Sequence, residues 1–379
     1  MRAVARVGLI GLQGYGRVHL REVDRLAQLG KVELVACADV KAPSEEAKEI
    51  LARLGPQRYW DYRELLDKER LDVVIVATPP HLHAPMALGA LEAGCHVLLE
   101  KPPVVEGADF DALESTARRQ QLACQVGFQA LGSGVLARLR ELAGGDELGV
   151  TPRLFATGHW RRDRAYWGRA PWAGRDRVDG RAAHDGALTN PFAHAVMNCC
   201  AILGCERTSD VKSVVADRYR ANAIEVDDTS VVQVTTAAGR SFSVAVTLCA
   251  ERSVDPICTL EGASASARWR YRHDRLELVR GNERCREESY ARRSLLEELV
   301  DLAVGKAVNL SSPLSKTQAF VTILEAISAS PVQEVPAARV LVEGSGPAAT
   351  TVIRGVDALV EQAAREAKTL AQLGLASTR

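Results

Sequence analysis

The amino-acid sequence predicts an α/β protein with two domains, the first a doubly wound parallel sheet and the second containing an antiparallel sheet. Short apolar segments rich in β-branched residues alternate with helical patterns over about the first 130 residues. Segments with period-two alternation follow from residue 211 onward. The length of 379 residues also favours two domains over one.

Charge and composition exclude several classes of protein. Lys plus Arg and Asp plus Glu both number 48, so no global charge favours nucleic acid or an anionic membrane as a partner. No apolar segment approaches the length of a membrane span, and the N-terminus leads directly into a strand, so we expect no signal peptide. The nine cysteines form no C-x-x-C motif. They predict buried free thiols in a reducing, cytoplasmic protein.

The first strand, Arg6–Ile10, leads into a glycine-rich turn and then a helix. Gly11, Gly14 and Gly16 permit a tight turn and let backbone N–H groups approach a pyrophosphate at the helix N-terminus. Gln13 stands where the pattern G-x-G-x-x-G has its second glycine, so the motif by itself is a weak indication. Its position between a strand and a helix strengthens it.

The second strand, Val32–Ala38, ends in Asp39, which follows Gly16 at about the 20-residue spacing of a ribose-binding carboxylate. The alternative is that Asp39 caps the turn before residues 42–44. An acidic residue here favours NAD. Lys41 leaves NADP open, because a cation can receive a 2′-phosphate.

A strand–helix–strand unit follows between Leu71 and Pro103. Val73–Ala77 is a buried strand that Thr78-Pro79-Pro80 ends, and Cys95–Leu99 is the next strand, with a helix over 83–93 between them. Glu100-Lys101-Pro102 comes at the carboxyl end of that strand, where open parallel sheets bind ligands. A lysine beside a carboxylate is positioned there for chemistry. The alternative is a surface lysine with Glu100 as its solvated partner.

Further short elements bring the number of predicted strands within residues 1–130 to six, and we predict that residues 131–379 form the second domain. They are helices at 44–54, 61–67 and 107–121 and strands at 58–60 and 123–127.

The second domain opens with the strand Arg153–Trp160 and an arginine-rich polar loop, Arg161–Ala183. The segment Asp185–His194 leads into a helix through Leu203. Other predicted elements are helices at 136–142, 294–304, 314–328 and 356–373, the last packed back on a domain, and strands at 231–235, 242–248, 266–270 and 276–279.

These motifs, in this order, resemble the glucose–fructose oxidoreductase / inositol dehydrogenase (Gfo/Idh/MocA) family. The resemblance is carried by residues 11–19, Asp39, the run ATPPHLH, Glu100-Lys101-Pro102 and Asn190-x-x-x-His194. It implies an N-terminal Rossmann domain and a C-terminal α+β domain with a large, open, mainly antiparallel sheet. It also implies NAD(P)-dependent hydride transfer at a hydroxyl-bearing carbon of a sugar, cyclitol or related polyol, in a homodimer or homotetramer built through the sheet face.

The resemblance assigns residues by position. The implied cofactor-binding residues are Gly11, Gln13, Gly14, Tyr15, Gly16, Asp39, Thr78, Pro79, His83, Glu100, Lys101 and Gln129. The loop after the strand at 153–160 is placed beside the substrate, with Trp160, Tyr166, Trp167, Trp172, Arg175 and Asn190 as binding residues, because flat aromatics stack on sugars and arginine reaches hydroxyls or carboxylates. The remaining arginines of that loop can equally be solvated.

Oxidation of an alcohol needs a base, and His194 is the first candidate because histidine titrates near neutral pH. It follows Asn190 at i+4, which on one helix would put both side chains on one face. Lys101 would hydrogen-bond the reacting oxygen or relay its proton. Asn190 stands where many members have aspartate, so we expect His194 to be less basic here. A core histidine is the alternative.

Other functions stay open at this point. An NAD-dependent glycoside hydrolase would release an aglycone without net reduction of NAD. A non-catalytic sensor would keep only the dinucleotide fold. His81-x-His83 suggests a metal site, but no third ligand is evident, and we predict no metal.

Overall fold

The computed structural model describes residues 4–149, 152–281 and 283–376. The chain forms two compact units. Unit 1 contains the residues up to Gly132 together with Arg293–Thr317, and unit 2 contains Ser133–Arg292 and the residues from Gln318 onward. The sequence-based division at 130/131 left residues 293–317 in the second domain, whereas this segment returns to unit 1.

Unit 1 is built on a six-stranded parallel sheet in the order β3-β2-β1-β4-β5-β6. Its strands are β1 (Ala5–Ile10), β2 (Val32–Ala38), β3 (Gln57–Tyr59), β4 (Val73–Val76), β5 (His96–Leu99) and β6 (Cys124–Val126). Its helices are α1 (Gly16–Gln28), α2 (Glu45–Leu54), α3 (Tyr62–Lys68), η1 (Pro80–Leu82), α4 (His83–Glu92), α5 (Gly107–Gln120), η2 (Gln129–Gly132), α9 (Leu295–Ala303) and η4 (Leu314–Lys316).

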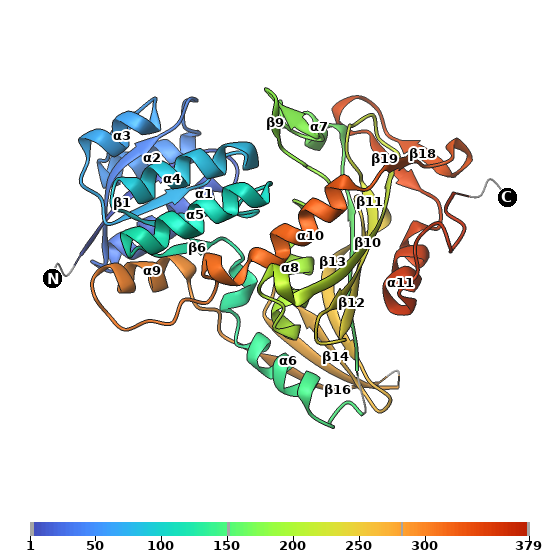
Figure 1. The fold of residues 1–379 in the computed structure, drawn as a ribbon. Helices are drawn as coiled ribbons and strands as arrows, with labels where there is room; N and C mark the ends of the chain where they lie inside the picture. Colours follow the sequence, from blue (N-terminus) through green and yellow to red (C-terminus); the bar gives the residue numbers. More distant parts are fainter. Residues whose placement is uncertain (1–3, 150–151, 282, 377–379) are drawn as a thin grey trace. The chain divides into compact units, whose positions relative to one another are not determined.

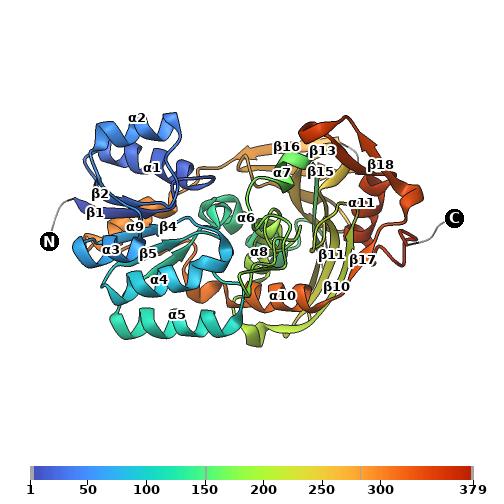
Figure 2. The same ribbon diagram turned by 90° about the horizontal axis from the view of Figure 1, so that it is seen from above.

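Helices cover both faces of this sheet (Figures 1 and 2). All four residues of β4 are buried, as the continuous apolar run Val73–Val76 predicts for a central parallel strand. The helix α9 joins the core of α1, α2, β1, β2 and β4 through Leu295 and Leu299. This apolar contact is the physical reason why residues 293–317 fold with the first unit.

Unit 2 is built on a nine-stranded sheet in the order β16-β15-β14-β13-β7-β12-β11-β10-β17. All its neighbouring strands are antiparallel except the pairs β7–β12 and β10–β17. The strands are β7 (Arg153–Arg161), β10 (Val211–Arg220), β11 (Thr229–Thr236), β12 (Ser241–Thr247), β13 (Cys249–Glu261), β14 (Ser266–Arg270), β15 (Arg275–Arg280), β16 (Glu283–Ser289) and β17 (Val332–Glu334).

Helices pack on both faces of the nine-stranded sheet (Figure 1). On one face, α8 (Ala193–Leu203) lies with α6 (Val135–Gly144) and α10 (Gln318–Ala329). On the other, α11 (Val356–Glu366) buries Val356, Val360 and Ala363 among residues of β7, β11 and β12. The predicted mainly antiparallel sheet is thus confirmed, and α11 covers the central strands on one of its faces.

Several boundaries differ from the sequence-based predictions. In the nine-stranded sheet, β10, β13, β16 and β17 were missed. β13 contains Pro256 and several charges, and its register shift between Val254 and Ile257 accommodates the proline. The C-terminal helix ends at Glu366 and not at residue 373, because Ala367 adopts a left-handed conformation with φ of 48°. The predicted helix 314–328 is divided at Thr317 into η4 and α10.

The loop between β7 and α8 is more ordered than expected. It contains α7 (Arg164–Trp167) and the two-stranded ribbon β8 (Arg177–Val178) and β9 (Arg181–Ala182). Elsewhere in unit 2, β18 (Val340–Glu343) pairs with β19 (Thr350–Ile353), and short helices η3 (Thr208–Asp210), η5 (Ala337–Arg339) and η6 (Gly346–Ala348) connect elements.

All nine cysteines are free, and eight of them are buried. Over the described ranges, every helix is too short or too polar to cross a membrane.

Candidate nucleotide and substrate sites

The glycine-rich turn after β1 has the close packing that its sequence predicts. A Cβ atom at Gly16 would lie 2.1 Å from the carbonyl oxygen of Gly11, and one at Gly11 would lie 2.4 Å from that of Ala77. Gly14 differs, because a Cβ atom there would meet nothing within 4 Å. The helix α1 begins with neither a side-chain cap nor an acidic residue in its first turn. The turn therefore leaves open space in front of the N-terminus of α1, where the partial positive charge of the helix dipole favours an anion.

Asp39 is fixed between this turn and the loop after β2. One carboxylate oxygen accepts a hydrogen bond from the backbone N–H of Leu12 at 2.6 Å, and the other accepts one from the backbone N–H of Lys41 at 2.8 Å. The side-chain amide of Gln13 donates to the carbonyl of Ala42 at 3.0 Å, so it also joins the two loops. These contacts place a carboxylate beside the glycine turn, which is the arrangement that a dinucleotide requires.

Glu100 is the centre of a buried polar cluster at the carboxyl end of β5. Its Oε1 lies 2.8 Å from Nε2 of His19 on α1 and accepts a hydrogen bond from Nε2 of Gln129 at 3.0 Å. Its Oε2 accepts one from the backbone N–H of Lys101 at 3.1 Å. A Cβ atom at position 127 would lie 2.5 Å from Oε1, so Gly127 is needed for the carboxylate to fit. Glu100 is thus a buried anchor, not a solvated partner.

His83 connects the loops after β4 and β5. Its ring is 1% exposed, with Nδ1 at 2.7 Å from the carbonyl oxygen of Pro102 and Nε2 at 2.8 Å from that of Thr78. Burial lowers the pKa of His83, although both carbonyls and Glu100 favour its protonated form. A neutral ring donates to only one of the carbonyls. His83 therefore positions Thr78, Pro79 and the Lys101-Pro102 segment from the interior.

The segment that carries Asn190 is a series of turns before α8. Pro191 and Phe192 separate Asn190 from the helix, which begins at Ala193, so the expected placement of Asn190 and His194 on one helix is wrong. The physical reason is the proline, which has no N–H to continue helical bonding. The Nδ2 of Asn190 donates to Oδ1 of Asp185 at 2.6 Å.

Asp185 supplies a carboxylate close to the position where the family pattern led us to expect one. It is 1% exposed, and its Oδ2 accepts hydrogen bonds from Nη2 of Arg169 at 2.7 Å and from the N–H of Gly174 at 2.8 Å. Burial raises the pKa of Asp185, while Arg169, Gly174 and Asn190 favour the ionised form. Asn190 is thereby held by a buried anion.

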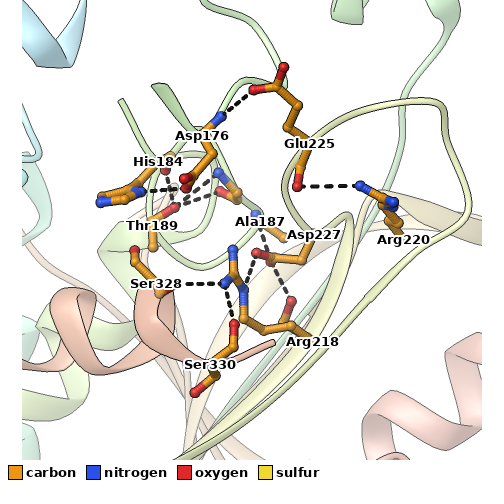
Figure 3. Close-up of polar contacts among 12 residues, drawn as sticks. Asp176, His184, Ala187, Thr189, Arg218, Arg220, Glu225, Asp227, Ser328 and Ser330 are labelled. Atoms are coloured by element: carbon orange, nitrogen blue, oxygen red, sulfur yellow. Dashed lines mark hydrogen bonds and ion pairs between the residues drawn. The ribbon is translucent and has the colours of Figure 1, made fainter. Parts of the chain in front are cut away.

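A second buried carboxylate, Asp227, fixes the start of the same segment (Figure 3). It accepts hydrogen bonds from the N–H of Ala187 at 3.0 Å, from Nε of Arg218 at 2.8 Å and from Ser230. Figure 3 shows Arg218 reaching on to the carbonyls of Ser328 and Ser330, at 3.0 and 2.7 Å. The segment before α8 is therefore tied to β10, β11 and the end of α10.

The aromatic residues predicted to stack on a sugar instead alternate with arginines. Trp160 stacks on Phe192 at 4.4 Å between ring centroids, and the guanidinium of Arg162 lies 4.6 Å from the Trp160 ring and 4.8 Å from that of Tyr166. Arg169 lies 4.0 Å from Tyr166 and 4.6 Å from the Trp172 ring. These contacts use ring faces that a sugar would need.

The other two predicted substrate residues lie at the edge of this group. Trp167 packs edge-on against Tyr166 and close to Gly174. Arg175 forms an exposed ion pair with Glu225.

His194 lies 6.4 Å from Tyr271 between ring centroids. Within the described part of the chain, no three His, Cys, Asp or Glu side chains cluster as metal ligands would.

Residues 5–128 match the model of an oxidoreductase family with an NAD-binding Rossmann fold. The match covers the part of the chain that contains the glycine turn, Asp39 and Glu100. The resemblance and the NAD assignment made from the sequence are thus confirmed, and the chain is related to oxidoreductases. The glycine turn, the uncapped helix and Asp39 fit the cofactor that the family description prints.

Curated relatives match the same domain. The chain is 34% identical over 123 residues, 32% of its length, to 4-carboxy-2-hydroxymuconate-6-semialdehyde dehydrogenase of Sphingobium sp. (strain NBRC 103272 / SYK-6), and this match spans 38% of that protein. It is 35% identical over 131 residues, 32% of its length, to alpha-N-acetylgalactosaminidase of Shewanella oneidensis, spanning 28% of that protein. The chain therefore matches well under half the length of these relatives.

A solved structure extends the similarity to both units at the level of the fold. The WlbA dehydrogenase of Bordetella pertussis, in complex with NADH and UDP-GlcNAcA, aligns with a TM-score of 0.68 and 21% identity over 86% of this chain and 95% of that one. This confirms the Rossmann-plus-antiparallel-sheet fold class.

The sequence did not reveal the roles of His19, Asp185, Arg218 and Asp227. His19 lies within the recognised motif, three residues after its last glycine, and that spacing was the available signal. The partners of the other three lie up to 112 residues away, and no local pattern marks them.

Proposed function

We propose that this protein is an NAD-dependent oxidoreductase that transfers a hydride between nicotinamide and a hydroxyl-bearing carbon of a sugar, cyclitol or related polyol. The single observation that carries the proposal is the buried Glu100 cluster next to Lys101, at the carboxyl end of a strand in the domain that matches the NAD-binding family. The sugar nucleotide named with the similar WlbA structure supports the substrate class. NAD, when bound, supplies the hydride acceptor or donor.

In unit 1, Gly11, Gly14 and Gly16 hold the pyrophosphate against α1, and Asp39 accepts hydrogen bonds from the adenosine ribose. The carboxylate of Asp39 repels a 2′-phosphate, which favours NAD over NADP. Glu100 orients Lys101 through its backbone N–H, and Lys101 donates a hydrogen bond to the reacting oxygen.

In unit 2, His194 accepts the hydroxyl proton during oxidation and returns it during reduction. Asn190 orients a substrate hydroxyl through its amide, with Asp185 fixing the amide rotamer. Because the Asn190 side chain is neutral, it stabilises an imidazolium at His194 less than an aspartate would.

A second candidate is a glycoside hydrolase that uses bound NAD, and the similarity to the Shewanella galactosaminidase favours keeping it. The two functions share the NAD-binding domain, so only the reaction distinguishes them. The hydrolase releases an aglycone and leaves the total amount of oxidised NAD unchanged.

The test is a titration of the purified full-length chain with NAD and NADP, followed by a panel of aldoses, cyclitols and sugar nucleotides monitored by absorbance of reduced nicotinamide. We expect turnover that Lys101→Ala lowers on the order of a hundredfold or more. Lys68→Ala, in an exposed ion pair with Glu64, is the control and should leave turnover unchanged. NAD binding without turnover, combined with nitrophenyl glycoside cleavage, would replace this proposal with the hydrolase.

A further inference from the structure

Among the residues that the structure describes, no carboxylate forms an ion pair with Arg162. It follows β7, with its backbone N–H bonded to the carbonyl of Leu248 at 3.0 Å. Its guanidinium lies between the rings of Trp160 and Tyr166, at 4.6 and 4.8 Å. Its Nε is buried and, among the residues that the structure describes, has no hydrogen-bond acceptor.

The neighbouring arginines provide the contrast. Arg169 and Arg272 also lie over these aromatic rings, but each forms an ion pair, Arg169 with Asp185 at 2.7 Å and Arg272 with Asp255 at 2.6 Å. Asp163 is next to Arg162 in the chain, but its Oδ1 caps α7 by accepting from the N–H of Tyr166 at 2.8 Å.

The environment of Arg162 disfavours its charge. Burial lowers the pKa of Arg162, and Arg169 and Arg272 add to this effect, while Tyr166 and Asp163 oppose it. A guanidinium nevertheless stays protonated in proteins, so its donors need an acceptor. The N–H donors of a guanidinium lie in its own plane, so with a ring on two sides an acceptor has to approach along that plane.

Arg162 is also close to the proposed substrate segment. Trp160 stacks on Phe192 at 4.4 Å and with an interplanar angle of 27°. Phe192 is two residues from both Asn190 and His194. The guanidinium thus contacts Trp160, and Trp160 packs on the residue that lies between Asn190 in the turn and His194 in the first turn of α8.

We propose that Arg162 binds a carboxylate of the substrate, so that the substrate is a sugar acid of the hexuronate type or a derivative of one. The planar guanidinium donates two parallel hydrogen bonds to the two carboxylate oxygens. A carboxylate fits better than a phosphate dianion, because Arg169 and Arg272 are already engaged by aspartates and leave one guanidinium to bind the anion. The inference rests on the proposed function, whose substrate it narrows.

Calorimetric titration of the full-length chain with glucuronate and with glucose, at saturating NADH, which cannot accept a hydride from them, tests the proposal. We expect wild type to bind glucuronate at least about tenfold more tightly than glucose, since a charge-assisted pair is added. Arg162→Gln should abolish this preference, and Arg162→Lys should keep part of it because charge is retained and the fork is lost. Arg164→Gln, an exposed arginine two residues away, is the matched control and should keep the full preference.

Three results would overturn the assignment: no preference in wild type, a preference that survives in Arg162→Gln, or tighter binding of glucose 6-phosphate than of glucuronate through Arg162. Thermal unfolding of each variant separates a binding defect from a folding defect, and Arg162→Lys provides a second variant if Arg162→Gln is unstable. Binding is read without turnover. A protein that prefers glucuronate but shows no oxidoreductase activity would therefore keep this inference and lose the proposed function. An active oxidoreductase without the preference would do the opposite.

Discussion

The two candidate sites are held in place by different means. In unit 1, the glycine turn, Asp39 and the Glu100-Lys101 segment follow β1, β2 and β5, whose carboxyl ends lie at the same edge of one parallel sheet, so backbone geometry brings them together. In unit 2, the segment that carries Asn190 consists of turns before α8, and the buried carboxylates Asp185 and Asp227 hold it. The comparison shows that the strand ends of one sheet bring the first site together, whereas buried carboxylates hold the turns of the second.

The strongest test of this difference removes the charge of Asp227. Asp227→Asn leaves Arg218 buried without its partner, and we expect a loss of about 3–5 kcal/mol in the unfolding free energy of unit 2. Urea unfolding followed by tryptophan fluorescence measures it, because four of the five tryptophans lie in unit 2. Glu225→Gln breaks only an exposed pair and should cost no more than about 1 kcal/mol. Equal losses would refute the role given to the buried pair.

The corresponding test of unit 1 changes backbone space and not charge. Gly16→Ala puts a methyl group 2.1 Å from the backbone oxygen of Gly11, and we expect it to destabilise unit 1 by about 2–3 kcal/mol or more. The methyl group of Gly14→Ala meets no atom, and an alanine at the φ of 51° costs only about 1 kcal/mol of stability. The domain should therefore fold, but the methyl group occupies space proposed for the pyrophosphate and should weaken NAD binding. Circular dichroism and NAD titration separate the two effects. Unchanged NAD affinity in Gly14→Ala would contradict the pyrophosphate position.

Asn190→Asp tests whether asparagine is required beside Asp185. It replaces a donor 2.6 Å from the Asp185 oxygen by a second carboxylate, and we expect a loss of about 1–3 kcal/mol at neutral pH. Burial already raises the pKa of Asp185, and a second carboxylate raises it further. When the folded-state pKa is raised, the loss of stability is largest at pH values above that pKa. The loss shrinks as the pH falls through the raised pKa toward the ordinary aspartate range. Asn190→Ala loses the hydrogen bond without adding charge and should show no such recovery on acidification.

The smallest expected effect concerns the attachment of α9 to α1. Lys31 lowers the pKa of Glu297, and Arg25 adds to this lowering while partial burial opposes it. A lowered folded-state pKa stabilises unit 1 above the ordinary value of 4.5 and loses this contribution as the pH falls through the folded-state value. Because the pair is partly exposed, Glu297→Gln should cost about 0.5 kcal/mol at neutral pH and nothing in acid. A constant difference across this range would exclude the ion pair as the cause.

The sequence by itself determined the parallel sheet of unit 1, with the glycine turn and the carboxylates at its strand ends. Buried strands such as Val73–Val76 have a local signature, and the positions of Gly16, Asp39 and Glu100 follow from where their strands end. It did not determine the roles of His19, Asp185 and Asp227, nor the alternation of arginines with aromatic rings around Trp160. It also missed the return of residues 293–317 to unit 1. The contacts of His19 and Asp227 join residues far apart in the chain, and those of Asp185 and the arginines depend on how the turns around them fold. A charge or ring therefore shows its partner only once the tertiary structure brings the two together.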